Sequence, residues 1–268
     1  MQRMRLEVIV RCAAFVLSLA GGLSAATVLG QTPQPGTPPA AGQNPILVEL
    51  FTSEGCSSCP PADDLLRKID GKHLNGGPMI VGVSEHVTYW DHGGWKDPFD
   101  SDAVTDRQTQ YSQKFHLDSP YTPQIVVNGK TQLVGSDGPA LLKAISEVQQ
   151  QAATVKIVSA KVEGGSVVAS VAVAGELSKH GADLYVVVAQ DETTTKVTAG
   201  ENKGRTLQNA AVARTFQKAA RLKAIGETTV RIPLPVDLKT TADSRRHLIV
   251  WAQEPDLGPV LGVDTLAF

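Results

Sequence analysis

The sequence predicts an α/β domain followed by a mostly-β, sandwich-like domain. Within residues 46–151, apolar runs rich in β-branched residues alternate with segments of helical periodicity, in the order β–α–β–α–β–β–α. An Asn-Gly pair between the last two strands is typical of a two-residue hairpin, which makes the sheet mixed. Beyond residue 152 the apolar residues alternate with a period of two, as in an antiparallel sandwich. We therefore expect the α/β domain over residues 45–152 and the β-rich domain over residues 153–268.

The composition excludes two classes of protein. Of the 268 residues, 42% are hydrophobic and 19% are charged, so the chain can bury a core and is not an intrinsically disordered segment. Its formal net charge is −2. Because nucleic-acid binding needs a basic face to neutralise phosphates, we expect no nucleic acid among the partners.

The first residues have the layout of a secretory signal peptide. Three arginines among the first eleven residues precede an apolar stretch over residues 12–23 and a group of small residues that offers a cleavage site. The alternative is an uncleaved membrane anchor, but the apolar stretch is short for a span of about 20 residues. We expect a signal peptide over residues 1–30, a Pro/Gly-rich linker over residues 31–44, and an exported protein, periplasmic or secreted, with no stable membrane insertion after cleavage.

The elements of the α/β domain follow from local patterns. Ala62, Leu65, Leu66 and Ile69 recur at helical spacing after the first apolar run, and a second helical pattern covers residues 101–116. Helices between the first three strands favour parallel pairing of those strands. The expected strands are residues 46–53, 79–84, 124–127 and 130–135, and a last helix covers residues 137–151.

The β-rich domain is predicted from turns and alternation. Residues 153–175 alternate around Gly164-Gly165, which is the pattern of a hairpin. Residues 204–224 are an exception, because their pattern is long and partly helical. Further short strands are expected at residues 184–189, 193–197, 228–234 and 247–253.

Two cysteines carry the chemistry that the sequence offers. Cleavage of the leader removes Cys12 and leaves Cys56 and Cys59, between a strand and a helix. At a helix N-terminus the unpaired N–H groups and the helix dipole stabilise a thiolate and lower the pKa of its thiol below the free value of about 8.5. We expect an exposed Cys56 that attacks a disulfide and a Cys59 that resolves the resulting mixed disulfide.

Two further segments are expected to surround the cysteines. Thr122-Pro123 precedes the third strand, so its loop should lie beside the first helix, and a cis bond there would present backbone to a substrate peptide. Tyr89, Trp90 and Trp95 lie in the loop after the second strand, where open α/β sheets place ligands. They are expected to form a wall of the substrate groove, with His86 near enough to tune the thiolate; the alternative is that the tryptophans fill a hydrophobic gap.

These features carry a resemblance to a known fold and family. Residues 46–151 resemble a thioredoxin fold, with Cys56 and Cys59 at its redox motif and Thr122-Pro123 at its cis-proline loop. The stretches ELFTSEGCSSCPPADDLL, HVTYWDHGGWKDPF and YTPQIVVNG are similar to the DUF1223 family of secreted bacterial proteins. The similarity runs from about residue 45 to the end and includes residues 200–205. The family name carries no established activity, so the resemblance implies a fold and a compartment rather than a reaction.

The resemblance also shows departures. Ser57 and Ser58 stand where thioredoxin has Gly and Pro, so its redox poise does not carry over. Glu49, on the first strand, is the candidate for thioredoxin's buried acid. In residues 200–205 we expect a tight loop with a Glu201–Arg205 pair rather than a phosphate-binding loop, because the sequence lacks the Gly-Lys-Ser/Thr ending.

The leading functional hypothesis is a thiol–disulfide oxidoreductase that needs no cofactor and acts on protein thiols and disulfides. One alternative is a metal-binding or chaperone module in which Cys56, Cys59 and His86 hold copper or zinc. Another is a non-catalytic binding scaffold whose disulfide only stiffens the start of a helix. The sequence leaves both alternatives open.

Overall fold

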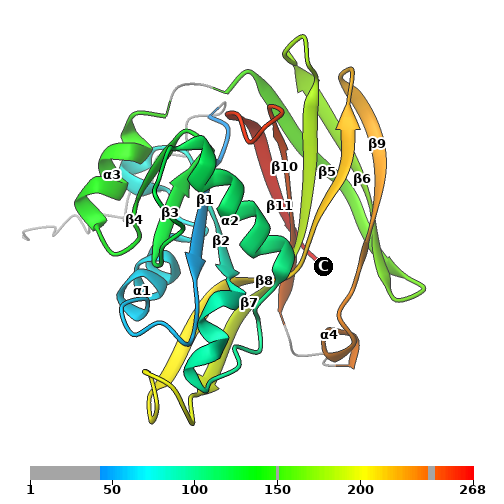
Figure 1. Cartoon of the computed structure of the whole chain (residues 1–268). Helices are drawn as coiled ribbons and strands as arrows, with labels where there is room; N and C mark the ends of the chain where they lie inside the picture. The colour runs from blue at the N-terminus through cyan, green and yellow to red at the C-terminus, as the bar shows by residue number, and fades with distance from the viewer. Residues whose placement is uncertain (1–42, 149–150, 241–244) are drawn as a thin grey trace, which may run out of the picture. The chain divides into compact units, whose positions relative to one another are not determined.

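Two β-sheets form the framework of the computed structural model, which describes residues 43–148, 151–240 and 245–268 (Figure 1). The expected signal peptide over residues 1–30 lies outside these residues, as does all of the expected linker except residues 43 and 44. Among the residues that the structure describes, no helix is both long enough and apolar enough to cross a membrane.

The first part of the chain has the expected element order, with two short 3-10 turns, η1 and η2, added. The apolar run of β1 is buried over its whole length, and Pro60 starts α1, where a missing N–H costs nothing. The elements are β1 (Ile46–Thr52), α1 (Pro60–Ile69), η1 (Leu74–Gly76), β2 (Ile80–His86), η2 (Thr88–Gly93), α2 (Asp102–Lys114), β3 (Gln124–Val127), β4 (Thr131–Val134) and α3 (Gly138–Ser146).

The second part consists mainly of strands. The hairpin around Gly164-Gly165 is confirmed, and the two strands expected between residues 184 and 197 form one long strand with bulges. The elements are β5 (Ala153–Glu163), β6 (Ser166–Gly175), β7 (Ala182–Lys196), β8 (Thr206–Leu222), β9 (Gly226–Pro233), α4 (Val236–Thr240), β10 (Arg246–Gln253) and β11 (Val260–Ala267).

The partly helical interpretation of residues 204–224 is wrong, because most of this segment forms strand β8. Its alanines, arginines and lysines are good helix formers, but β8 pairs with β7 in an antiparallel ladder from Thr206 to Leu222. The ladder pairs the backbone groups on the facing edges of both strands, and this long-range pairing outweighs the local propensity.

The larger sheet is mixed, with the order β11-β10-β7-β8-β2-β1-β3-β4. β1 and β2 are parallel as expected, but the expected parallel pairing of the third strand is wrong, because β3 runs antiparallel to β1. The reason is the path after α2. The Lys114 ammonium at the end of this helix donates to the carbonyl of Gly129, whereas the Gln108 side chain donates to the carbonyl of Tyr121. The segment between α2 and β3 therefore runs back along the helix and enters β3 from the same end at which β1 leaves the sheet.

Four strands of the second part, β7, β8, β10 and β11, continue the larger sheet. β8 joins β2 through a parallel bridge between Ser84 and Val212, so the sheet crosses the domain boundary expected near residue 152. That boundary stays a prediction. The smaller sheet, β5-β6-β9, packs on β7, β10 and β11 through a shared apolar core, in the manner of a sandwich (Figure 1).

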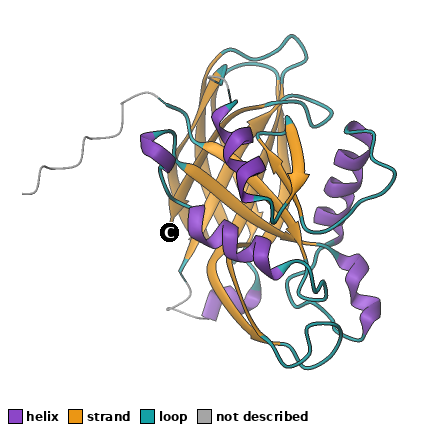
Figure 2. Cartoon of the chain, turned by 90° about the vertical axis from the view of Figure 1, so that its left-hand side faces the viewer, coloured by secondary structure: helices purple, strands orange, loops and turns teal. Residues whose placement is uncertain are grey.

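Side-chain alternation along β1 separates two further cores. Figure 2 shows helices lying against the strands. Leu50 and its even-numbered neighbours pack with α1 and α3, whereas Leu47 and Phe51 face α2 and the aromatic residues of β7 and β10. The carboxyl ends of β1 and β2 lie side by side, since Thr52 pairs with His86. The loops that follow these two strands therefore meet at one edge of the sheet.

Candidate functional site

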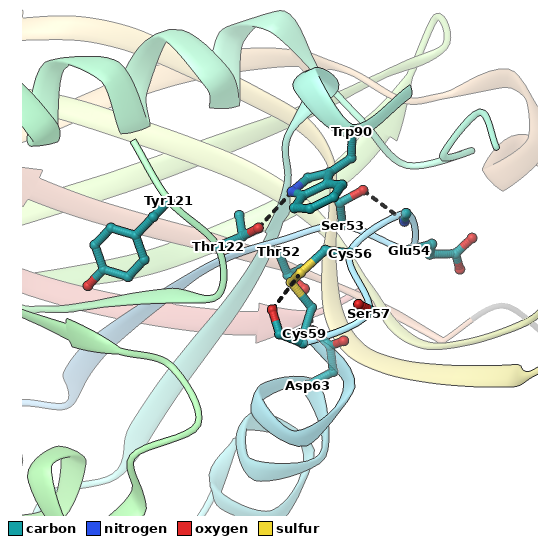
Figure 3. The surroundings of a disulfide bond; sticks show 12 residues. Thr52, Ser53, Glu54, Cys56, Ser57, Cys59, Asp63, Trp90, Tyr121 and Thr122 are labelled. Carbon is teal, nitrogen blue, oxygen red and sulfur yellow. Dashed lines mark hydrogen bonds between the residues drawn. A yellow bond between two sulfur atoms is a disulfide. The ribbon is translucent and has the colours of Figure 1, made fainter. Parts of the chain in front are cut away.

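A disulfide joins Cys56 and Cys59 at the N-terminus of α1 (Figure 3). The loop after β1 tightens into successive turns, in which the Cys56 N–H donates to the Ser53 carbonyl and the Cys59 N–H to the Cys56 carbonyl. The Ser58 hydroxyl lies 3.4 Å from the Cys56 sulfur. The expected position of the pair between a strand and a helix is confirmed.

The expected exposure of Cys56 is wrong, because both cysteines have a relative exposure of 0%. Ser57 and Ser58 are exposed above them. Figure 3 shows the indole of Trp90 beside the disulfide. A Cβ on Gly55 would lie 3.0 Å from the Cβ of Trp90, so the η2 turn packs directly on the backbone of the cysteine loop.

The cis-proline loop and the aromatic loop meet at the cysteines. The Thr122–Pro123 bond is cis, as expected, and the Trp90 indole N–H donates to the Thr122 hydroxyl at 2.7 Å (Figure 3). The Trp95 indole donates to the Glu54 carboxylate at 3.2 Å. These two tryptophans therefore lie beside the cysteine loop, and their expected role as a wall of a substrate groove stays a prediction.

Tyr89 is the third residue expected in this wall. Its hydroxyl donates to the side chain of Gln108 on α2, and burial raises the pKa of Tyr89 to about 12, although hydrogen bonds oppose the effect. Tyr89 is thereby tied to the helix rather than to the disulfide.

His86 lies under the cysteine loop and acts on it through Asp97. His86 is 1% exposed, and its Nδ1 lies 2.8 Å from Asp97 Oδ2. Burial lowers the pKa of His86, but the neighbouring carboxylates, above all that of Asp97, together outweigh this effect and raise the pKa overall. The same carboxylate oxygen accepts from the Glu54 N–H at 2.7 Å and from the Ser53 hydroxyl at 3.2 Å. The pair therefore anchors the cysteine loop from below.

Asp63 is the functional candidate that the sequence reasoning missed. It lies four residues after Cys59, on the same side of α1, and Figure 3 shows it next to the cysteine loop. Its carboxyl accepts from the Thr52 hydroxyl at 2.7 Å. Burial raises the pKa of Asp63 to about 7, while His86 and the Thr52 hydrogen bond act in the opposite direction. The sequence did carry one signal for this position, because Asp63 lies at helical spacing from both Cys59 and the buried Leu66. Acidic residues are common in the exposed first turn of a helix, so this signal was easily overlooked.

The structure does not bring Glu49 to the cysteines. Glu49 points to the α2 side of the sheet, opposite to Thr52, because residues at odd and even positions of β1 face different sides. Its carboxylate accepts from Arg107 Nε at 2.5 Å and from the Tyr111 hydroxyl at 2.8 Å. The structure therefore gives no support to Glu49 as the tuning acid, whereas Asp63 lies next to the cysteine loop.

The turn between β7 and β8 closes the site from the second part of the chain. The buried Asn202 side chain donates to the carbonyls of Glu54 and Cys56 at 2.8 and 2.9 Å. The Glu201 carboxylate accepts from the Ser57 N–H at 3.1 Å. The expected Glu201–Arg205 pair is wrong, since Arg205 donates to the carbonyl oxygen of the Asn202 side chain and fixes its orientation.

The structure does not support the metal alternative. Within residues 43–148, 151–240 and 245–268, no group of three or more His, Cys, Asp or Glu side chains is arranged to hold a metal ion. Cys56, Cys59 and His86 are thus not gathered into a set of ligands, and Nδ1 of His86 faces Asp97 instead.

Comparisons with known proteins identify a family and show similar folds. A family model described as "Protein of unknown function (DUF1223)" matches residues 47–253. The crystal structure of protein AGR_C_4864 from Agrobacterium tumefaciens is 27% identical, with a TM-score of 0.59, over 82% of this chain and 93% of that chain. HBP35 of Porphyromonas gingivalis is 13% identical, with a TM-score of 0.57, over 84% of this chain and 75% of that chain, and shows the fold alone. No curated protein sequence matches this chain.

Proposed function

We propose that this chain, which belongs to the DUF1223 family of proteins of unknown function, is an exported thiol–disulfide oxidoreductase with a thioredoxin-like arrangement over residues 45–152. The observation that carries the proposal is the joint placement of the Cys56–Cys59 pair at the start of α1 and the cis Thr122–Pro123 bond beside it. The strand order β2-β1-β3-β4, with β1 and β2 parallel, supports the thioredoxin-like arrangement. The signal-peptide pattern supports export.

The reaction exchanges two electrons with a partner disulfide. The Cys56 thiolate attacks one sulfur of the partner, the partner's S–S bond breaks, and the leaving thiolate takes a proton. Cys59 then loses its proton and attacks the Cys56 sulfur, so the partner leaves as a dithiol and the Cys56–Cys59 bond re-forms. The reverse sequence oxidises a partner dithiol. The partner class is a protein or glutathione disulfide.

Asp63 is suited to take the proton of Cys59. It is the buried carboxyl one helical turn after this cysteine, and burial raises its pKa to about 7. A carboxyl with such a pKa accepts and returns a proton near neutral pH. His86 and Asp97 lie beneath it as a second pair that keeps the loop in place.

The burial of the disulfide favours a second candidate, a scaffold with a structural disulfide. A glutathione redox titration of the mature protein separates the two. A reversible midpoint between about −120 and −270 mV is expected for an exchange protein, whereas a midpoint below about −300 mV marks a structural disulfide and rejects the proposal.

Substitution of each cysteine tests the assigned roles. Cys56→Ser should abolish exchange with a disulfide substrate, because the attacking thiolate is lost. Cys59→Ser should leave the attack intact and trap a mixed disulfide, which non-reducing electrophoresis and intact-mass measurement detect. If both variants exchange disulfides at the rate of the parent protein, the proposed function is wrong.

The position of Trp90 beside the buried disulfide leads to a separate prediction. Trp90→Phe removes the hydrogen bond to Thr122 that holds the indole beside the disulfide. We expect the disulfide to be reduced by dithiothreitol about fivefold faster than in the parent protein. Trp95→Phe is the matched control, because Trp95 binds Glu54 from the same loop. Equal reduction rates in the Trp90 variant and the control would show that Trp90 does not limit access.

A further inference from the structure

The turn of residues 200–205 lies far from the cysteines in sequence but is in direct contact with them. Asn202 contacts the cysteine loop through two carbonyls, those of Glu54 and Cys56, and Glu201 contacts it through the Ser57 N–H. Gly200 has a φ of +70°, and a Cβ there would lie 3.1 Å from the Cβ of Trp95. The turn is therefore fitted between the cysteine loop and the aromatic loop.

We propose that this turn controls the reactivity of Cys56, with Asn202 as a positioning residue for the cysteine loop and Glu201 as a fixed negative charge at its rim. The inference rests on the proposed function. It assigns to the second part of the chain a role in the redox site: β7 and β8 carry the turn, and without it the carbonyls of Glu54 and Cys56 each lose the Asn202 side chain as a donor.

Asn202 restrains the loop because its amide can do so in only one orientation. Its side chain is fully buried, both of its N–H bonds go to loop carbonyls, and Arg205 donates to its oxygen at 2.8 Å. A leucine of similar size cannot donate, so the carbonyls of Glu54 and Cys56 would be left without this partner. The loop around the buried disulfide should then open more often.

Glu201 acts through charge. Hydrogen bonds from the Ser57 hydroxyl and the Ser57 N–H lower the pKa of Glu201, so it stays ionised at neutral pH. A carboxylate beside Cys56 disfavours the Cys56 thiolate and hence the reduced form. The other charged or titratable groups around the cysteine loop are Glu54, Asp63, His86 and Asp97. Beyond them, His92 stacks on Trp90 and Arg205 binds the side chain of Asn202.

The charge is tested with Glu201→Gln, which can still accept from the Ser57 N–H. The equilibrium with glutathione should shift about threefold toward the reduced protein, about 14 mV at 29.6 mV per tenfold change. The shift should be present above the pKa of Cys56, vanish about one pH unit below it, and shrink in 1 M NaCl, because only the thiolate feels the charge. Glu176→Gln, at another exposed position, is the control.

The restraint is tested with Asn202→Leu, whose disulfide should be reduced by dithiothreitol at least fivefold faster than that of the parent protein. Asn209→Leu, at a buried asparagine of β8, is the matched control. If the parent protein shows no reversible equilibrium with glutathione, the proposed function fails. A reversible equilibrium in the parent protein, with an unchanged equilibrium in Glu201→Gln, overturns only the inference about the turn. This result stands even if Asn202→Leu does not fold.

Discussion

Replacing Asp63 with asparagine is expected to change the pH dependence of stability more than any other substitution near the cysteines. Burial raises the pKa of Asp63 from 3.8 in an unfolded chain to about 7 in the folded protein. The folded state therefore holds a proton that the unfolded state releases between these pH values. The resulting stability is fully present below about pH 4 and is lost as the pH rises through 7.

The size of this effect follows from the pKa difference. A difference of about 3 corresponds to about 4 kcal/mol in the free energy of unfolding. Asp63→Asn keeps an acceptor for the Thr52 hydroxyl and has no proton to lose, so its free energy of unfolding should vary less between pH 4 and 8. At pH 8 the variant should be more stable than the parent protein by a few kcal/mol, measured by urea denaturation across this range.

Asp64→Asn is the matched control, because Asp64 is the exposed neighbour of Asp63. Its free energy of unfolding should stay within about 1 kcal/mol of that of the parent protein at every pH, because only an exposed ion pair is lost. The resolving step gives a second readout: Asp63→Asn should release mixed disulfides at least tenfold more slowly near pH 7, because the base for Cys59 is missing. Parallel stability profiles for the parent protein and Asp63→Asn would contradict the buried, protonated carboxyl.

Local sequence patterns were sufficient to predict the strand and the helix that carry the cysteine pair. The apolar run before Cys56 and the helical spacing after Cys59 place the pair at a helix N-terminus from residues that lie next to each other in sequence. The glycine turn at 164–165 specifies its hairpin in the same way. A cis bond before Pro123 was expected from its position relative to the strands, and it is present.

Features that depend on distant segments were not predictable in this way. The contact between Asn202 and the cysteine loop joins residues 146 apart in sequence, and nothing at either position marks it. The direction of β3 depends on the path of the segment between α2 and β3. This segment has no periodic sequence pattern from which its path could be predicted. The choice of Glu49 as the acid near the cysteines is not supported, for a related reason. Which face of β1 is covered by α1 and which by α2 depends on packing, so the sequence did not show that Glu49 lies on the α2 side.

A buried ion pair around Arg107 links the two parts of the chain. Arg107 is 2% exposed, and its guanidinium binds Glu49, the Tyr111 hydroxyl at 3.0 Å and the Gln253 side chain at 2.9 Å. Glu85 is buried nearby, and neither of its carboxylate oxygens has a hydrogen-bond partner among the described residues. Burial and the negative charge of Glu49 raise the pKa of Glu85 well above its usual range, and Arg107 opposes them. The guanidinium also lies 4.6–5.3 Å from the ring centroids of Tyr111, Tyr185, Phe216 and Trp251.

Arg107→Met is therefore expected to destabilise the protein by about 3–5 kcal/mol, because it leaves the Glu49 carboxylate buried without a cation. That loss is a large part of the 5–15 kcal/mol typical of a folded domain. Urea denaturation measures it, and Arg67→Met, which removes only an exposed pair with Asp64, should cost less than about 1 kcal/mol. Adding Glu49→Gln to Arg107→Met should restore part of the stability, since the stranded charge disappears. A double variant no more stable than Arg107→Met would mean that the cost comes from lost packing against the rings rather than from the charge of Glu49.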